Sequence, residues 1–188
     1  MHQILPQNIS YPYTSKKPVK DLYFDTTITD PYRWLEDEYS PKTKSWVEKQ
    51  NSTTNRYLRK ISYRNNIENR LKEVWDYPSY SIPFKKGNNY YFYKNDGMQN
   101  QSVLYTTESL DKEPEVLLDP NTLSKDGTIA LRGTYFSKSC NYMGYALSKA
   151  GSDWIEFYIL NLKTRNLLKD KINWVKFSEM SWHGNGFY

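Results

Sequence analysis

Strand-like segments recur in the same order in two halves of residues 77–188, and this repeat limits the folds open to the chain. The first set comprises residues 89–94, 101–107, 115–118 and 129–137. The second set comprises residues 142–147, 154–160 and 166–169. Equivalent segments lie roughly 40 to 55 residues apart, a period typical of β-propeller blades with about four strands each. A plain meander sandwich is the alternative that the pattern leaves open.

Composition agrees with a sheet-rich fold. Aromatic residues make up 16% of the chain, while all hydrophobic residues together reach only 38%. Aromatic side chains are enriched in strands, so tyrosine-rich sheets take the place of aliphatic cores. The low aliphatic content disfavours a large doubly wound α/β core within this chain.

Helix signals precede the strands. Asp30-Pro31 and Ser40-Pro41 each combine an N-cap residue with proline at the first helical position, and residues 65–75 predict a further helix. This last helix is expected to bury one apolar face, made of Ile67, Leu71, Val74 and Trp75. Residues 1–27 show no period and predict an extended, partly flexible lead-in. The predicted division is a helical segment over residues 1–76 and a partial propeller over residues 77–188.

The repeat predicts an incomplete ring. About two blades fit in the sequence, and residues 177–188 begin a third, whereas a propeller closes with about four to eight. The sequence stops at Tyr188 inside a predicted strand, without a cap. The expected fold class is therefore an α+β fragment: a helical segment followed by about two antiparallel four-stranded blades of an incomplete β-propeller.

Charge and cysteine content favour no nucleic-acid, membrane or metal partner. The net charge of +5 is spread evenly along the chain, which indicates a solvated surface. Cys140 is the only cysteine, and His2 and His183 are the only histidines, so neither a metal site nor a cofactor is expected. Neither a signal peptide nor an apolar membrane span is evident, and the expected location is the cytoplasm.

The sequence predicts no catalytic residues. A serine hydrolase of the α/β type needs a G-x-S-x-G elbow, and none occurs. Gly151-Ser152-Asp153 lies in a predicted hairpin turn, and His183 lies in another turn. We therefore expect the isolated polypeptide to have no peptidase activity.

Seven segments in order carry a family resemblance. They are DPYRWLED, TKSWVEKQN, DYPSYS, YYFYKNDGMQNQSVLY, LLDPNTLSKDGTIALRG, LSKAGSDW and VKFSEMSWHGNGFY. Together they resemble the N-terminal region of the prolyl oligopeptidase family, from about residue 11 to residue 188. The resemblance implies a seven-bladed propeller that covers an α/β-hydrolase domain. It also implies cleavage of short proline-containing peptides by a Ser, Asp and His triad. That domain and its triad have no counterpart in this chain.

The resemblance also implies residues that touch substrate. It places Phe177 one subsite removed from the proline pocket and Asp153 near the cavity between the domains. Phe177 would supply apolar surface, and Asp153 would attract a peptide's ammonium group. The alternatives are that Phe177 is an aromatic residue of a blade core and that Asp153 is an ordinary turn residue.

The resemblance implies a docking role for the residues of DPYRWLED and the next segment. Tyr32, Trp34, Leu35 and Trp46 are expected to bury against the hydrolase domain, with packing on the helix of residues 64–75 as the alternative. Two other functions stay open: a non-catalytic β-propeller-like binding module, and a basic nucleic-acid binder that stacks bases on tyrosines. The even charge distribution disfavours the latter.

Overall fold

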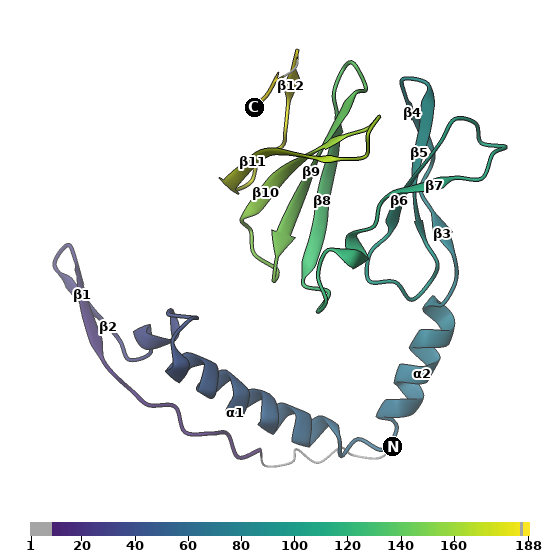
Figure 1. Ribbon diagram of the computed structural model, residues 1–188. Coiled ribbons are helices and arrows are strands. Elements are labelled where there is room, and N and C mark those ends of the chain that lie inside the picture. The colour runs from purple at the N-terminus through teal and green to yellow at the C-terminus, as the bar shows by residue number, and fades with distance from the viewer. Residues whose placement is uncertain (1–8, 185) are drawn as a thin grey trace. The chain divides into compact units, whose positions relative to one another are not determined.

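A computed structural model describes residues 9–184 and 186–188. Figure 1 shows a mixed α+β chain, and the expected fold class of helices followed by antiparallel four-stranded sheets is confirmed. The chain divides into two compact units, one ending at Arg70 and the other beginning at Leu71. The two units are described separately below. The division falls inside a helix, while the sequence-based boundary after residue 76 stays a prediction.

The first unit contains a β-hairpin, a short 3-10 helix and a long α-helix. Its elements are β1 (Val19–Tyr23), β2 (Thr26–Asp30), η1 (Arg33–Leu35), α1 (Pro41–Leu58) and the start of α2 (Arg64–Trp75). Of the expected extended, partly flexible lead-in over residues 1–27, residues 1–8 lie outside the described residues and residues 19–27 form β1 and the start of β2, a hairpin that the sequence analysis did not predict. The turn between them uses Phe24 at a φ of 52°, a conformation usually taken by Gly or Asn, so the sequence carried no turn signal.

Helix α1 begins as its sequence predicts. Ser40 is the N-cap, its Oγ accepts a hydrogen bond from the backbone N–H of Thr43 at 3.1 Å, and Pro41 opens the helix. The prediction that Asp30 caps a helix is wrong. The Asp30 carboxylate instead accepts from the N–H of Tyr32 at 2.7 Å, in a tight turn that delays η1 to Arg33.

The predicted apolar face of α2 is not buried. Ile67, Leu71, Val74 and Trp75 are all exposed, Leu71 at 54%. Helical spacing gathers apolar residues on one face, but it does not say which surface covers that face. The prediction that this face is buried is therefore wrong for the described chain.

The second unit contains the two blades. The first is a five-stranded sheet in the order β3-β5-β6-β7, with β4 also paired to β5. Its strands are β3 (Ser79–Tyr80), β4 (Phe84–Lys86), β5 (Asn89–Asn95), β6 (Val103–Thr107) and β7 (Glu115–Leu118). The second is a four-stranded antiparallel sheet in the order β8-β9-β10-β11. Its strands are β8 (Ile129–Phe136), β9 (Tyr142–Lys149), β10 (Ile155–Asn161) and β11 (Leu167–Val175).

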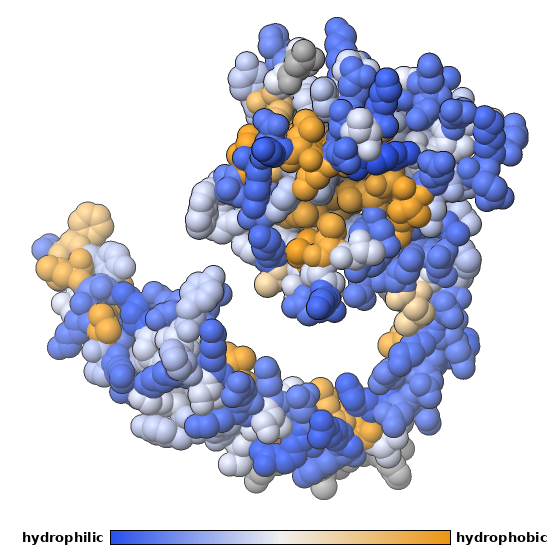
Figure 2. Space-filling model, in the orientation of Figure 1, coloured by the Kyte–Doolittle hydropathy of each residue, from blue (hydrophilic) through white to orange (hydrophobic). Residues whose placement is uncertain are grey.

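A shared core joins the two blades. Leu104 of the first blade and Met143 of the second are fully buried in one hydrophobic cluster, together with Tyr91. The rings of Tyr91 and Phe136 lie 4.5 Å apart across the interface between the blades. Aromatic side chains therefore fill much of the interior of the two blades, in keeping with the low aliphatic content of the chain. Figure 2 shows hydrophobic residues gathered on the visible face of this unit.

The last elements pack on the second blade. The short hairpin of β12 (Trp182–His183) and β13 (Gly186–Phe187) follows Met180, which is buried with Ala146, Phe157 and Ile159. The indole N–H of Trp182 donates to the carbonyl of Tyr135 at 2.9 Å. After η2 (Pro120–Thr122), the described chain thus builds one complete four-stranded blade, and the terminal hairpin packs on that blade.

Candidate functional site

The register of β10 and β11 brings both predicted site residues to one edge of the second blade. Ile155 pairs with Val175, so the residues just before Ile155 lie beside those just after Val175. Asp153 and Phe177 therefore lie at the same end of these two paired strands. Together with Trp154, Trp174 and Lys176 they form what we call the edge cluster.

Lys176 links the members of the edge cluster. Its Nζ lies 3.5 Å from a carboxylate oxygen of Asp153, 5.3 Å from the ring of Trp154 and 5.1 Å from the ring of Phe177. The cluster therefore contains one anion and one cation in contact, rather than an unpaired carboxylate. Solvent reaches both charges, so the attraction between them is weak and sensitive to salt.

Phe177 lies open to solvent. Its side chain is 87% exposed, and its backbone φ is 52°. It follows β11 instead of lying within a strand. Among the described residues Phe177 is therefore no part of a blade core, and its ring is free to contact a ligand.

Trp174 is a member of the cluster that the sequence did not predict. Ile155 pairs with Val175 and Phe157 with Ile172, so β11 contains one extra residue, a β-bulge, at residues 173–174. Trp174 has a φ of 61°, and its ring meets Trp154 edge-on with centroids 5.7 Å apart. A bulky residue in the left-handed region costs on the order of 1–3 kcal/mol. A β-bulge cannot be recognised from the two-residue alternation of side chains in a strand. The sequence analysis therefore did not predict Trp174 as a member of the site.

A charged group beside the edge cluster stabilises the second blade. The carboxylate of Glu156 accepts a hydrogen bond from the Tyr158 hydroxyl at 2.6 Å and pairs with Lys149 and Lys171 at 2.9 and 3.1 Å. The Tyr158 hydrogen bond, followed by the two lysines, lowers the pKa of Glu156 to about 2. All donors around this carboxylate come from β9, β10 and β11, so its role is to hold the strands together.

Ser152 and His183, the residues that most resemble catalytic groups, make contacts that stabilise a turn and a hairpin. The Ser152 Oγ accepts from the backbone N–H of Trp154 at 3.1 Å, which closes the hairpin turn. His183 pairs with Gly186 in the terminal hairpin, and its ring lies 6.3 Å from that of Tyr188. His2 lies outside the described residues. Within the described part of the chain, no group of three or more His, Cys, Asp or Glu side chains could hold a metal ion.

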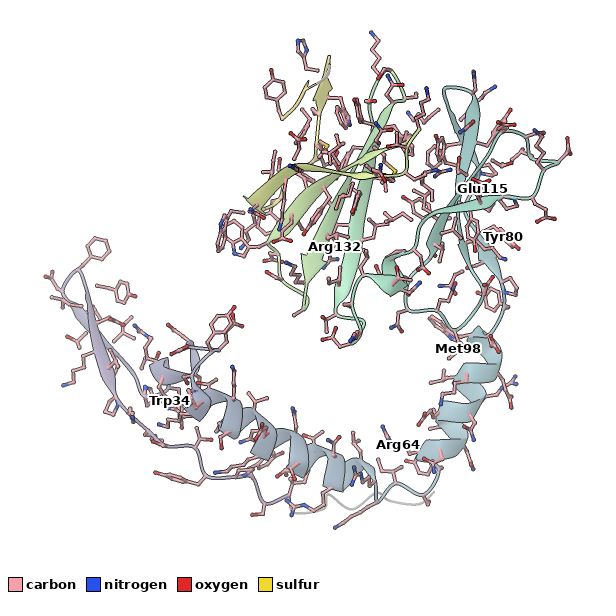
Figure 3. The ribbon with its side chains drawn as sticks, in the orientation of Figure 1. Trp34, Arg64, Tyr80, Met98, Glu115 and Arg132 are labelled. Atoms are coloured by element: carbon pink, nitrogen blue, oxygen red, sulfur yellow. The ribbon has the colours of Figure 1, made fainter. Side chains whose placement is uncertain are left out.

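The tryptophans of the first unit lie against its own extended segment. The indole N–H of Trp34, labelled in Figure 3, donates to the carbonyl of Ser15 at 2.9 Å, and Lys42 Nζ lies 3.8 Å from its ring. The indole of Trp46 donates to the Thr14 hydroxyl at 2.9 Å. The sequence reading missed this partner, because residues 14–15 carry no periodic pattern. No described helix is long and apolar enough to cross a bilayer.

Comparison with known sequences gives relatives along almost the whole chain. The model of the family "Prolyl oligopeptidase, N-terminal beta-propeller domain" matches residues 11–188. The prolyl endopeptidase of Elizabethkingia meningoseptica is 43% identical over 96% of this chain and 26% of its own length. Prolyl oligopeptidase A of Amanita bisporigera is 34% identical over 95% of this chain and 27% of its own length. The chain thus spans about a quarter of the length of these relatives.

Solved structures agree with the sequence comparison. A structure from an analysis of two prolyl endopeptidases has a TM-score of 0.80 at 29% identity, over 92% of this chain and 26% of its own. Prolyl oligopeptidase B from Galerina marginata, bound to a 35mer hydrolysis and macrocyclization substrate, has a TM-score of 0.72 at 26% identity. That match covers 92% of this chain and 27% of the other. The catalytic domain of these relatives lies outside the matched region. This chain belongs to the prolyl oligopeptidase family, in which it corresponds to the N-terminal β-propeller region.

Proposed function

We propose that this chain forms the propeller side of the peptide site in a serine endopeptidase that cleaves short peptides after proline. The edge cluster carries the proposal, because it places two predicted substrate-contacting residues together on an exposed edge. The chain itself supplies no catalytic group, and hydrolysis would come from an α/β-hydrolase domain as its partner. A cytoplasmic location stays a prediction.

Each residue of the cluster has a distinct task in this proposal. The exposed ring of Phe177 offers apolar area to a peptide side chain. The carboxylate of Asp153 already pairs with Lys176 at 3.5 Å, so a peptide's N-terminal ammonium would have to share it with Lys176 or replace Lys176. Asp153 therefore adds little net affinity, and Phe177 dominates.

Exposed apolar residues of α2 support docking to the hydrolase domain. Leu71, Val74 and Trp75 present apolar surface that no described residue buries. Burying this surface would contribute roughly 25 cal/mol per Å² of apolar area. Within the first unit, Trp34 and Trp46 hold the extended segment at residues 14–15.

A chimeric enzyme tests the proposed function. Residues 11–188 would replace the matching region of the Elizabethkingia meningoseptica prolyl endopeptidase, and cleavage of a Gly-Pro fluorogenic substrate would be measured. The chimera is expected to cleave after proline. Phe177→Ala in this chimera is expected to raise KM roughly two- to tenfold for a hexapeptide and hardly at all for a dipeptide substrate. Equal effects on both substrates would remove Phe177 from the site.

A non-catalytic peptide-binding module is the second candidate. The exposure of Phe177 and Trp174 in the edge cluster favours it, because both rings are open to a peptide. This candidate predicts that the chain binds proline-containing peptides alone and that the folded chimera does not cleave them.

A further inference from the structure

We propose that Trp174 is a specificity-determining residue that gives the edge cluster a second aromatic contact for peptides, beyond Phe177. This inference rests on the proposed function. It predicts a preference for peptides that carry two large aromatic side chains on the same face, where Phe177 alone would select for one.

The backbone supports a role for Trp174 outside the core. Trp174 and Phe177 both have positive φ, at 61° and 52°, and a bulge introduces the first of them. Bulky residues rarely adopt this conformation, and β-bulges frequently re-aim a side chain near a binding site. Burial of the side chain does not offset this strain, because Trp174 is 79% exposed.

Other tryptophans of the chain show what a structural role looks like. Trp34, Trp46 and Trp182 each donate the indole N–H to an oxygen of the same unit. Trp182 also stacks on Tyr142, with centroids 6.3 Å apart. Trp174 instead meets Trp154, which is itself 47% exposed, so the pair presents an aromatic surface to solvent.

Distances in the cluster fit an extended peptide. Phe177, Lys176, Trp154 and Trp174 form a chain of contacts with steps of 5.1, 5.3 and 5.7 Å. Alternate side chains on one face of an extended peptide are about 6.8 Å apart. The rings of Phe177 and Trp154 are separated by no more than the sum of the first two of these steps, a range that includes this spacing, so a peptide with one side chain on Phe177 can bring the next side chain of the same face onto the tryptophan pair. Lys176 between the rings allows a peptide carbonyl to bind there.

Fluorine NMR of the 188-residue chain tests the inference. The chain would be labelled with 5-fluorotryptophan and titrated with two peptides, acetyl-Trp-Gly-Phe-Gly-Pro-amide and the same peptide with alanine in place of tryptophan. We expect the tryptophan peptide to bind about two- to tenfold more tightly and to shift the resonance of Trp174. In Trp174→Gly the two affinities should become equal while both peptides still bind, because glycine accepts the positive φ.

A matched control is Phe24→Gly. Phe24 is also an exposed aromatic residue at positive φ, but it lies in the hairpin of the first unit, so the ratio should stay unchanged. The same variants in the chimera give an independent measurement, the ratio of kcat/KM for the two peptides. Each peptide is extended by one residue after proline so that it can be cleaved.

The outcomes separate the inference from the proposed function. Binding of both peptides with equal affinity, with loss of binding in Phe177→Ser, would overturn the inference and leave the proposed function intact. The same holds if the ratio survives in Trp174→Gly. If neither peptide binds the chain and the folded chimera cleaves neither, both the inference and the proposed function are wrong.

Discussion

Several residues adopt strained backbone conformations that the sequence pattern does not predict. Six non-glycine residues of the described chain have positive φ, and Phe24, Trp174 and Phe177 are aromatic. Sequence reading found Phe177 only through the family resemblance, and it found neither Phe24 nor Trp174. Aromatic residues are expected in strands, so nothing in their identity signals a turn or a bulge. Only the backbone geometry reveals them.

Phe24 allows a direct test of the strain. Phe24 is 97% exposed at a φ of 52°, so Phe24→Asn loses no packing and relieves the left-handed conformation. We expect the free energy of unfolding to rise by about 0.5–1 kcal/mol, measured by urea denaturation. Tyr23→Asn, in the adjacent strand position, is the control and should not stabilise. A loss of stability in Phe24→Asn would contradict the assigned turn.

Glu156 predicts a pH dependence of stability. Its folded pKa of about 2 lies below the ordinary value of 4.5, so the ionised form stabilises the fold. This stabilisation is complete above about pH 5 and is lost as the pH falls toward 2. Glu156→Gln should cost about 1–2 kcal/mol at pH 7, reduced by solvent screening, and little at pH 2.

The control for this prediction is Glu108→Gln. Glu108 pairs with Lys112 at 2.7 Å on the exposed surface, so its loss should shift the urea midpoint much less than the loss of Glu156. Equal shifts for the two variants, or a Glu156→Gln effect that does not change with pH, would contradict the assigned role.

At the scale of elements, hydrophobic spacing predicted most of the blades and part of the helices. The segments 115–118 and 142–147 coincide with β7 and most of β9, and the Ser40-Pro41 signal correctly opens α1. Alternation of side chains in strands and capping chemistry act over a few residues, so sequence alone suffices there. The pairing of β4 with β5, and the bulge in β11, depend on neighbouring strands and could not be predicted.

Packing between β9 and the segment before β12 predicts an energetic coupling. A Cβ added at Gly144 would clash with the Met180 sulfur, and Met180 is buried there. Gly144→Ala should cost about 1–3 kcal/mol by overpacking. The double variant with Met180→Ala should cost less than the sum of the two single changes, because the smaller side chain gives room to the new methyl group. Additive costs in urea denaturation would contradict this packing.

At the scale of the whole molecule, each unit leaves apolar surface uncovered. In the first unit Leu22 and Phe24 are exposed near the tip of the β1–β2 hairpin, which is orange in Figure 2. Exposed apolar patches mark surfaces that meet another polypeptide. The amphipathic spacing of α2 predicted an apolar face and its burial, but the face is exposed in the described chain, and no sequence pattern in this chain identifies a partner for it. The partner that we propose is the α/β-hydrolase domain implied by the family resemblance.

We propose that this chain supplies the peptide-facing propeller structure of a prolyl endopeptidase, with the catalytic groups in another domain. The most direct test compares cleavage of the Gly-Pro fluorogenic substrate by the chain alone and by the chimera with the Elizabethkingia meningoseptica catalytic domain. We predict no cleavage by the pure chain and cleavage after proline by the chimera. Cleavage by the chain alone, or a folded chimera that leaves the substrate intact, would contradict the claim.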